Sequence, residues 1–463
     1  MSQRNRLVPI IVAFPLFLQN LDTSVMGTAL PSIARSLQVQ PLRLNLAITS
    51  YLLSLAVFLP LSGWFAERFG AKRVFCWAIA FFALGSALCG AATSLGSLVL
   101  YRVIQGLGGA MMVPVGRLLL LRSVPAALMV GAMVWFTVPP AIGRMVGPLV
   151  GGAIVTWTSW RWIFLINVPF GLLGIALAWN FIQDTPVESE AKPFDLAGFV
   201  LMALGLVGAL SALETAGKAV VAPWVSWALG ATGLLALAIY GWRYRRRTHP
   251  LIDLDVLRFP TYRNSIVGGT PLRIAIGASP FLLPLMLQLG FGLTPLESGL
   301  LTVATAVGSL ATRVVMTTAI RRVGFRSLLV GATALTSFFY MSYGLFTPGT
   351  SHALMFLAMM LGGLFNSMTM VSMQTLGFSE IPKPLMSHAT TLNSMAQQLS
   401  LSFGVVFGAT LVSAAAWWRD GDPKLLAPHD FSPAFVVIGL TTLISMLCFM
   451  RLDPNEGASM RGA

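Results

Sequence analysis

The chain has 463 residues, of which 56% are hydrophobic and only 10% are Asp, Glu, Lys or Arg, and its formal net charge is +14. Soluble domains carry about 25% charged residues, so this composition excludes an ordinary soluble enzyme or binding module and indicates a polytopic membrane protein. The positive charge does not indicate a nucleic-acid partner, because Lys and Arg gather in the loops expected on one side of the membrane.

A membrane span needs about 20 mainly apolar residues, and the chain contains fourteen such stretches, separated mostly by short loops. Six form a first group, at about 7–30, 44–66, 74–93, 98–121, 131–156 and 161–182. Six form a last group, at about 262–288, 298–319, 325–346, 351–377, 391–416 and 431–451. We therefore predict an all-α membrane protein with two six-helix bundles and two extra central helices.

The region between the two groups predicts the domain boundaries. A polar stretch with acids and prolines, 184–193, precedes two further spans at about 194–215 and 223–242, which end at a cluster of arginines. These spans contain almost no charge beyond Glu214 at an outer end. The predicted domains are an N-terminal bundle (1–183), a cytoplasmic linker with an inserted helix pair (184–249), and a C-terminal bundle (250–463).

Basic residues predict the orientation. The clusters that fall on one side of the predicted spans are Arg4 and Arg6, Lys72 and Arg73, Arg243 with Arg245, Arg246 and Arg247, and Arg321, Arg322 and Arg326. Loops rich in Lys and Arg stay in the cytoplasm. An even number of spans then places both the N- and the C-terminus in the cytoplasm, in a multi-pass protein of the cell (inner) membrane.

The first span carries the only acid that lies well inside a predicted span, Asp22. At about 1.5 Å per residue it lies about 12 Å from the Leu30 end, deep enough for a charged group to be costly. One interpretation is a protonatable site that faces a water-filled path, with Gln19 one turn earlier lining the substrate cavity. The other is an acid that leans outward to water or caps a neighbouring helix.

The loop after the second span combines an acid, basic residues and glycines, at Gly63, Glu67, Arg68, Gly70, Lys72 and Arg73. Such a cluster can form a latch in one conformation and open in another. The alternative is the ordinary basic decoration of a cytoplasmic loop, which accounts for the Lys and Arg but not for Glu67.

A similar turn follows the second span of the last group. Arg322, Gly324 and Arg326 repeat the Arg-x-Gly-x-Lys/Arg pattern of Arg68, Gly70 and Lys72. Two related six-span halves in the same orientation are typical of transporters, in which the substrate site lies between the halves near the membrane midplane.

In the fourth span one helix face carries Arg102, Gln105, Gly109, Met112 and Gly116. An unpaired Arg inside a membrane costs at least about 2.5 kcal/mol, so this face should meet water or an acid. The alternative is that Arg102, about one turn from the outer end, snorkels to the surface. We assign Gln105 and Met112 to the substrate cavity.

The fifth span has glycines at every fourth position, Gly143, Gly147 and Gly151, with Pro148 and Gly152 beside them. A stripe without side chains allows another helix to approach closely, and Pro148 permits a bend. Simple helix packing and a gate explain this stripe equally well.

Other polar residues within spans are candidates for the substrate cavity. Arg144 and Arg273 lie near the middle of spans in opposite halves, and Asn366 and Gln374 flank a group of methionines that could form an adaptable wall. Methionines also serve as plain packing. If the arginines face the substrate, they favour a neutral or anionic molecule over a lipophilic cation.

These motifs resemble the major facilitator superfamily, and in particular its fourteen-span drug:proton antiporter branch. The matching residues are Leu21 to Val25 with Ala29 to Pro31, the loop Gly63 to Arg73, Arg102 with Gln105, Gly106, Gly108 and Gly109, and Gly143 with Gly147, Pro148, Gly151 and Gly152. The resemblance ties the fourth-span motif, Arg102 included, to proton transfer, and we assign proton coupling to Asp22 and Arg102. Glu67 departs from the usual Asp, Gly27 stands where Asn is usual, and Arg144 adds a cation to an uncharged motif.

We therefore expect a proton-coupled antiporter, a multidrug efflux transporter that exports small amphipathic molecules by alternating access. Its partners are the substrate, protons and the lipid bilayer, and we expect a monomer without cofactor, metal or nucleic acid. The inserted pair should be replaceable without loss of transport. The alternatives are an exporter of organic anions or metabolites, a non-transporting sensor or channel, and a membrane-embedded enzyme, for which the four scattered His offer no converging site.

Overall fold

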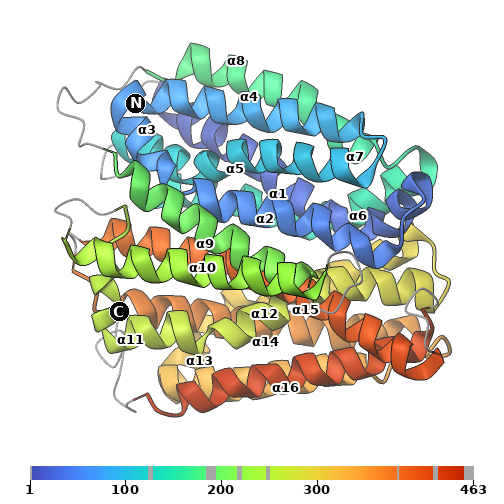
Figure 1. Ribbon diagram of the computed structural model, residues 1–463. Helices are drawn as coiled ribbons and strands as arrows, with labels where there is room; N and C mark the ends of the chain where they lie inside the picture. Colours follow the sequence, from blue (N-terminus) through green and yellow to red (C-terminus); the bar gives the residue numbers. More distant parts are fainter. Residues whose placement is uncertain are drawn as a thin grey trace. The chain divides into compact units, whose positions relative to one another are not determined.

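A computed structural model of the chain describes residues 3–123, 129–183, 194–215, 222–246, 251–382, 385–420 and 426–452. The regular elements in these ranges are helices, and they form two compact units (Figure 1). Unit 1 comprises Met1–Thr23, Leu46–Arg144 and Trp160–Leu254, and unit 2 comprises Ser24–Asn45, Met145–Ser159 and Asp255–Ala463. The predicted linker 184–193 lies outside the described residues, and the three-domain division stays a prediction.

Two long helices contribute to both units, since α1 (Gln3–Leu37) passes from one to the other after Thr23 and α6 (Met129–Trp157) passes after Arg144. The other helices of unit 1 are α2 (Asn45–Phe58), α3 (Leu61–Phe69), α4 (Ala71–Gly90), α5 (Leu95–Ser123), α7 (Trp162–Leu165), α8 (Asn167–Phe181), α9 (Leu196–Thr215) and α10 (Pro223–Arg243). Helix α4 packs against α5 and α8, and α9 packs against α10 (Figure 1).

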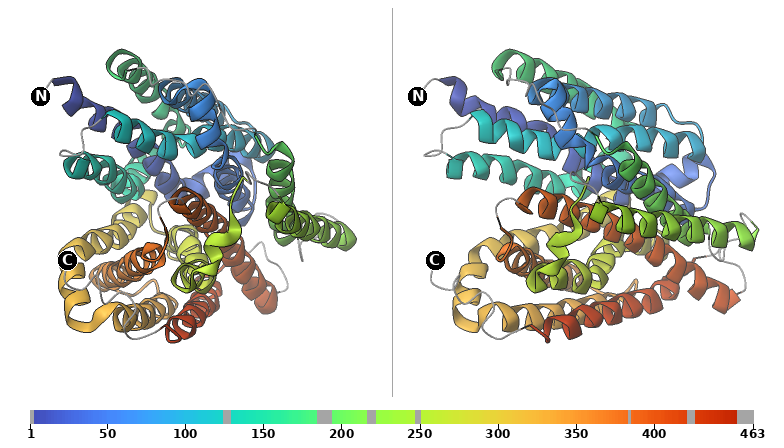
Figure 2. Two further views of the ribbon diagram at one scale, coloured as in Figure 1. Left: turned by 90° about the vertical axis from the view of Figure 1, so that its left-hand side faces the viewer. Right: turned by 60° about the vertical axis from the view of Figure 1, so that its left-hand side comes forward.

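Unit 2 contains α11 (Pro260–Arg263), the π-helical turn η5 (Asn264–Gly268), α12 (Thr270–Leu285), a second π-helical turn η6 (Met286–Gly290), α13 (Pro295–Tyr343), α14 (His352–Phe378), α15 (Met386–Asp420) and α16 (Phe431–Phe449). Helix α13 packs against α14 and α16, and α12 packs against α15 and α16 (Figure 2). Thr294 and Glu297 form a capping box at the start of α13, and the hydrogen bonds from Thr294 hold the pKa of the exposed Glu297 below its usual range.

Two glycines in matching positions turn the chain sharply. Gly70 separates α3 from α4 with φ 87°, and Gly324 interrupts α13 with φ 78°. Residues with a Cβ are disfavoured in this region of φ, so the turn requires glycine. These are the glycines of the two Arg-x-Gly-x-Lys/Arg turns, and their shared backbone conformation supports the predicted relation between the two groups of six spans.

Three predicted spans are interrupted rather than continuous. The second consists of α2 and α3, the sixth of α7 and α8, and the ninth of α11, η5, α12 and η6. Proline accounts for part of this, because Pro60 lies at the first break, Pro169 follows the second, and Pro280 and Pro284 lie within α12. Each proline removes one backbone donor from the helix and clashes with the preceding turn.

Among the described residues, twelve helices are long and apolar enough to cross a membrane. The protein is therefore a multi-pass membrane protein. Helix α6 and the part of α13 before Gly324 coincide with the predicted fifth and tenth spans but are not among the twelve. The count of fourteen spans stays a prediction.

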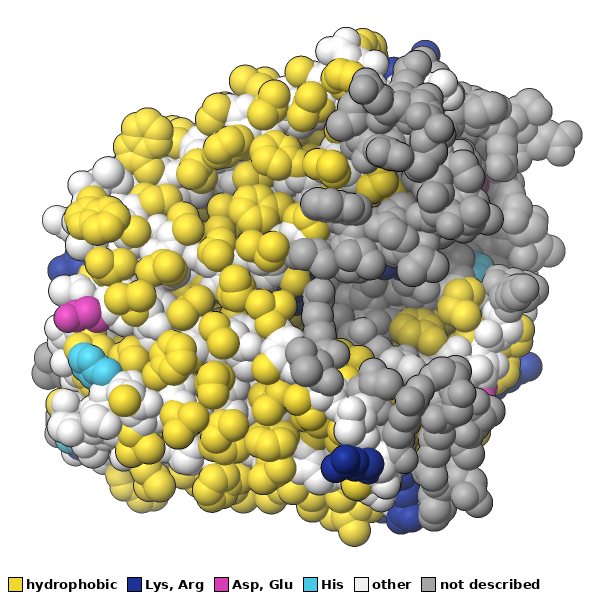
Figure 3. Space-filling view, turned by 180° about the vertical axis from the view of Figure 1, so that it is seen from behind, with side chains coloured by type: hydrophobic (Ala, Val, Ile, Leu, Met, Phe, Trp, Pro, Cys, Tyr) yellow, Lys and Arg dark blue, Asp and Glu magenta, His cyan; other side chains and the backbone are white. Residues whose placement is uncertain are grey.

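The outer surface of these helices is apolar. Large hydrophobic side chains such as Leu100, Trp227 and Leu440 are at least half exposed, and hydrophobic side chains cover most of the described surface in Figure 3. A soluble protein rarely exposes apolar surface on this scale, whereas lipid tails solvate it well.

Candidate functional site

Asp22 lies in the interior of a longer helix than the sequence suggests. The predicted first span ends at Leu30, but α1 continues to Leu37. At 1.5 Å per residue, Asp22 lies about 22 Å from the Leu37 end of the helix. The continuation carries no charged side chain as far as Ala34, so a helix of this length can stay in contact with other helices and lipid. Asp22 is 4% exposed, so the alternative of an acid that leans out to water does not hold.

Arg102 of α5 is the ion-pair partner of Asp22. Its Nη1 atom donates to Asp22 Oδ2 at 2.7 Å, and both side chains are only 1% exposed. The same nitrogen donates to Gln105 Oε1 at 2.6 Å, and Nε donates to the carbonyl oxygen of Ala47 on α2 at 3.2 Å. The prediction that this face of the fourth span meets water or an acid is confirmed by this ion pair, and the alternative that Arg102 snorkels to the surface does not hold.

Two amide side chains complete the coordination of the carboxylate. Gln105 Nε2 and Asn167 Nδ2 each donate to Asp22 Oδ1 at 3.0 Å. Both amides also donate to Ser86 Oγ on α4, at 2.7 and 3.3 Å. An ionised carboxylate only accepts hydrogen bonds, so this arrangement of donors from α5 and α8 matches the charged form of Asp22.

Two buried amide oxygens around this site have no hydrogen-bond partner among the described residues. They are Gln19 Oε1 and Asn167 Oδ1. Gln19 donates through Nε2 to the carbonyl oxygen of Gly109 at 3.1 Å, which places it beside the same stretch of α5. Buried polar groups are normally paired, and unpaired ones gather at sites whose protonation or occupancy changes.

Sequence reasoning missed three contributors to this site, Ser86, Asn167 and Tyr51. Asn167 could have been found by the argument that identified Asp22, because an amide within the apolar run 161–182 also has to be paired. Ser86 and Tyr51 gave no such signal, since a single Ser or Tyr is unremarkable in a membrane helix. Their importance follows only from their position beside Gln105 and Arg102.

The glycine stripe of α6 lies against α1. A Cβ at Gly143 would lie 2.6 Å from the carbonyl oxygen of Phe17, and one at Gly151 would lie 2.6 Å from Thr28 Oγ1, while Gly147 contacts Ser24. On its other side Gly152 approaches the carbonyl oxygen of Pro295, and Pro148 contacts Gly299. Close helix packing therefore accounts for the stripe, and part of it occurs directly beside the segment of α1 that carries Asp22.

The predicted cavity residues have different surroundings. Gln105 and Met112 are fully buried, and Gln105 belongs to the Asp22 site. Asn366 and Gln374 are partly exposed on α14, whereas Met368 and Met373 pack in separate apolar clusters of unit 2. The methionines thus serve as packing in this conformation.

The two other arginines also differ. Arg273 is 0% exposed, and it donates to the carbonyl oxygens of Ser265 and Ile266 at 3.0 and 3.3 Å and to Asn393 Oδ1 at 2.9 Å. Carbonyl oxygens of the π-helical turn therefore hold its charge inside unit 2, and a role of Arg273 in the substrate cavity stays a prediction. Arg144 is exposed on α6 and forms no ion pair among the described residues.

The loop predicted to act as a latch consists of α3 and the start of α4, joined at Gly70. Gly63 and Arg68 are exposed on α3, Arg73 is exposed on α4, and Lys72 lies over the ring of Trp179 with its Nζ 5.3 Å from the centroid. Glu67 is half-buried and takes part in no ion pair of the described chain. A latch at Glu67 therefore stays a prediction for another conformation.

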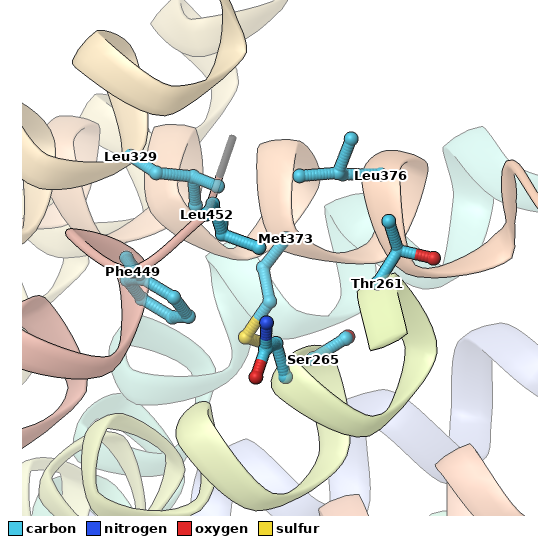
Figure 4. A pocket seen from close by; sticks show the side chains of 8 residues that line it. Thr261, Ser265, Leu329, Met373, Leu376, Phe449 and Leu452 are labelled. Carbon is cyan, nitrogen blue, oxygen red and sulfur yellow. The ribbon is translucent and has the colours of Figure 1, made fainter. Parts of the chain in front are cut away.

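A hollow in unit 2 is too small for a typical ligand. It is lined by Thr261, Asn264, Ser265, Leu329, Met373, Leu376, Phe449 and Leu452, seven of which are labelled in Figure 4. It has room for no more than about one water molecule, whereas sites for drug-sized molecules span roughly 300–1,000 Å³. Among the described residues, moreover, no three His, Cys, Asp or Glu are placed to hold a metal ion.

Solved structures with the same arrangement of helices are transporters of several kinds. An auto-inhibited POT family peptide transporter matches with a TM-score of 0.70 at 15% identity, and covers 97% of each chain. A bacterial homologue of the human lysosomal transporter Spinster, in an inward-facing and unoccupied conformation, matches with 0.70 at 12% identity over 97% of each chain. At these identities the likeness shows the fold alone.

Sequence comparison gives closer relatives. The chain is 36% identical over 449 residues to the "Putative multidrug resistance protein MdtD" of Salmonella newport (strain SL254), covering 96% of this chain and 94% of that protein. The protein of the same name from Salmonella typhimurium (strain LT2) matches equally well. The family model described as Major Facilitator Superfamily matches residues 12–404 and, in a second match, 266–461. The chain therefore belongs to the major facilitator superfamily.

Proposed function

We propose that this protein is a proton-coupled antiporter that exports small amphipathic molecules, drugs among them, across the inner membrane. The observation that carries the proposal is the buried ion pair of Asp22 with Arg102, because no structural need requires an acid in the middle of a membrane helix. The similarity to proteins named for multidrug resistance supports the substrate class. Fourteen spans, cytoplasmic termini and a monomeric state belong to the same proposal.

Proton movement provides enough energy for export. One elementary charge that crosses 100 mV releases about 2.3 kcal/mol, which sustains roughly a fifty-fold gradient of a neutral substrate. The sequence has no GxxxxGK[ST] loop for nucleotide phosphates, so the proton gradient is the energy source that the chain is equipped to use.

Protonation of Asp22 would change the contacts of α1. A protonated carboxyl has one donor and a weaker acceptor, so the contacts with Arg102, Gln105 and Asn167 cannot all persist. Asp22 lies one residue before the end of the part of α1 that belongs to unit 1. When Asp22 gains or loses its proton, α1 would shift at this point, and this shift would control alternating access.

Contacts within unit 2 support a state closed on the outer side. The end of α1 meets η6 and α12 there, since Gln288 Nε2 donates to the carbonyl oxygen of Thr28 at 2.9 Å and Gly27 contacts Pro280. The end of α6 meets α13 through Gly152 and Pro295. In the proposed topology these segments are the outer ends of their helices, and their separation would open the outward path.

The test of the proposal is the variant Asp22→Asn. It keeps the size of the side chain but cannot carry a proton, so we expect ethidium efflux from cells and ethidium-induced proton release from the purified protein to be lost. Glu297→Gln, at an exposed acid of α13, is the matched control and should retain both. Unchanged proton release and efflux in Asp22→Asn would show that another group carries the proton.

A second candidate is an exporter of organic anions. It is favoured by Arg144, an exposed cation on a helix expected to cross the membrane. At an effective dielectric of about 20, a cation 6 Å from this guanidinium meets roughly 2.8 kcal/mol of repulsion, about a hundredfold in affinity, and an anion gains a similar amount.

Substrate charge decides between the candidates. We expect the anion exporter to bind anionic amphiphiles more tightly than matched neutral and cationic ones, and to lose this order in Arg144→Gln. Arg263→Gln, at an exposed arginine of α11, serves as the control for a general loss of positive charge. Tighter binding of the cationic compounds by the unmodified protein would reject this candidate.

A further inference from the structure

Two aromatic rings enclose the guanidinium of Arg102. Its Cζ atom lies 4.4 Å from the ring centroid of Tyr51 on α2 and 5.5 Å from that of Phe164 on α7. Both rings are at most 1% exposed. Cations within about 6 Å of a ring centroid are attracted by the negative face of the ring, most strongly where water is excluded.

The rings matter because the partner of Arg102 is an acid whose charge would change during transport. A guanidinium remains protonated at any physiological pH, so proton uptake by Asp22 would leave a buried cation without its anion. Removal of one member of a buried pair is strongly unfavourable unless other groups take over. The remaining acceptors are Gln105 Oε1 at 2.6 Å and the carbonyl oxygen of Ala47 at 3.2 Å.

We propose that the ring faces of Tyr51 and Phe164 stabilise the positive charge of Arg102 when Asp22 is protonated. By doing so, the two rings help to set the pH at which Asp22 exchanges its proton. The inference rests on the proposed function, in which Asp22 is the proton carrier. It makes the two rings positioning groups for proton exchange, although neither carries the proton.

The direction of the effect follows from the charges. When Asp22 is ionised, the rings face a nearly neutral pair, and their attraction for Arg102 is opposed by repulsion from the carboxylate. When Asp22 is protonated, only the attraction remains. Arg102 is charged in both states, so the difference between them is the repulsion between the ring faces and the carboxylate. The rings therefore favour the protonated form, and their removal should lower the midpoint pH of proton uptake.

Among the described residues, the titratable groups that face Asp22 are Arg102, Tyr51 and Cys89, whose Sγ lies 4.0 Å from Gln105 Oε1, and the uncharged ones are Gln105, Ser86 and Asn167. The hydroxyl of Tyr51 lies beside Thr23 and Gln19. Tyr51→Phe therefore separates the role of the ring from that of the hydroxyl, and Cys89→Ala separates the thiol.

The experiment is a pH titration of the purified full-length protein without substrate, followed by the infrared carbonyl band of protonated Asp22, which Asp22→Asn identifies by its loss. We expect lower midpoints in Tyr51→Leu and Phe164→Leu than in the unmodified protein, and a midpoint near the unmodified value in Tyr51→Phe. Phe170→Leu, which removes a ring of α8 that packs against Phe14, is the control for the loss of an aromatic side chain elsewhere in unit 1.

Unshifted midpoints in folded Tyr51→Leu and Phe164→Leu would overturn the inference, and so would an equal shift in Tyr51→Phe. If Tyr51→Leu does not fold, Phe164→Leu and Phe164→Met decide the matter, because Met keeps most of the volume without a ring. The titration is independent of transport. Failure of the proposed function would appear separately, as normal ethidium efflux in Asp22→Asn.

Discussion

At the scale of single residues, the site is a network in which a carboxylate, a guanidinium and two amides satisfy one another inside the membrane. Charged groups in a low-dielectric interior are costly unless they are paired and hydrogen-bonded, and Asp22 and Arg102 meet both conditions. The buried charge of Arg273 is stabilised by carbonyl oxygens and by Asn393 instead of by an acid. Only the Asp22 network contains a group that can exchange a proton.

Asn167→Ala should weaken this network. It removes the amide that donates to Asp22 Oδ1 and Ser86 Oγ, and a hydrogen bond to a charged group contributes about 1.5–3 kcal/mol. We expect thermal unfolding in detergent to occur several degrees lower and efflux to fall. Asn180→Ala, on an exposed turn of the same helix, should change neither.

A double-mutant cycle tests whether Asn167 acts through Asp22. The effect of Asn167→Ala should shrink when Asp22 is already Asn, because the charge that strengthens the hydrogen bond is gone. Additive effects would indicate that Asn167 only supports the packing of α8.

At the scale of elements, glycines decide which helices approach closely. The glycine stripe of α6 allows that helix to pack closely against α1. Gly205, Gly208 and Gly233 likewise allow α9 and α10 to pack on each other. Gly70 and Gly324 instead provide turns with positive φ between consecutive helices. The same residue type thus serves two purposes, and the backbone conformation distinguishes them.

Gly151→Ala should be destabilising by about 1–3 kcal/mol, as for other overpacked sites. Its Cβ would lie 2.6 Å from Thr28 Oγ1 and 2.8 Å from Val25 Cγ1, so α1 and α6 would have to separate. The measurement is thermal unfolding in detergent. Gly241→Ala in α10, where an added Cβ meets nothing within 4 Å, should be neutral or stabilising, and an equal loss in both variants would contradict the packing role.

At the scale of the whole molecule, the inserted helix pair is joined to the helices of the proton site. Glu214 of α9 is 7% exposed and accepts a hydrogen bond from Thr49 Oγ1 of α2 at 3.3 Å. Thr49 lies two residues after Ala47, whose carbonyl oxygen holds Arg102. Glu214, which the sequence places at an outer end of the pair, is thus buried against α2. Replacement of the pair should therefore cost more than the loss of lipid contact alone.

Thr49→Val and Glu214→Gln should each reduce efflux a few-fold, because either change loosens α2 at the position that holds Arg102. Their effects should not add, since both weaken the same hydrogen bond, Thr49→Val by removing the donor and Glu214→Gln by removing the charge of the acceptor. Thr49→Ser keeps the hydroxyl and should retain activity. Normal efflux from a folded variant with a flexible linker in place of 194–243 would instead show that the pair is dispensable, as its sparse charge first suggests.

The sequence by itself determined the class of the protein, the positions of most helices and the residues that are costly to bury in a membrane. An apolar composition with basic loops requires a multi-pass membrane protein, and a lone acid and an arginine within spans require compensation, so Asp22 and Arg102 could be singled out without a structure. The paired turns at Gly70 and Gly324 were visible as well, because a local pattern encodes a local conformation.

Only the tertiary structure decided which groups meet. The partners of Asp22 lie 80 and 145 residues away, at Arg102 and Asn167, and the same holds for the rings around Arg102 and for the contact of Thr49 with Glu214. In a soluble helix a polar stripe reveals the outward face, but a membrane helix is apolar towards both lipid and its neighbours. The rotation of each helix, and hence the set of side chains at the site, is therefore set by packing between distant segments.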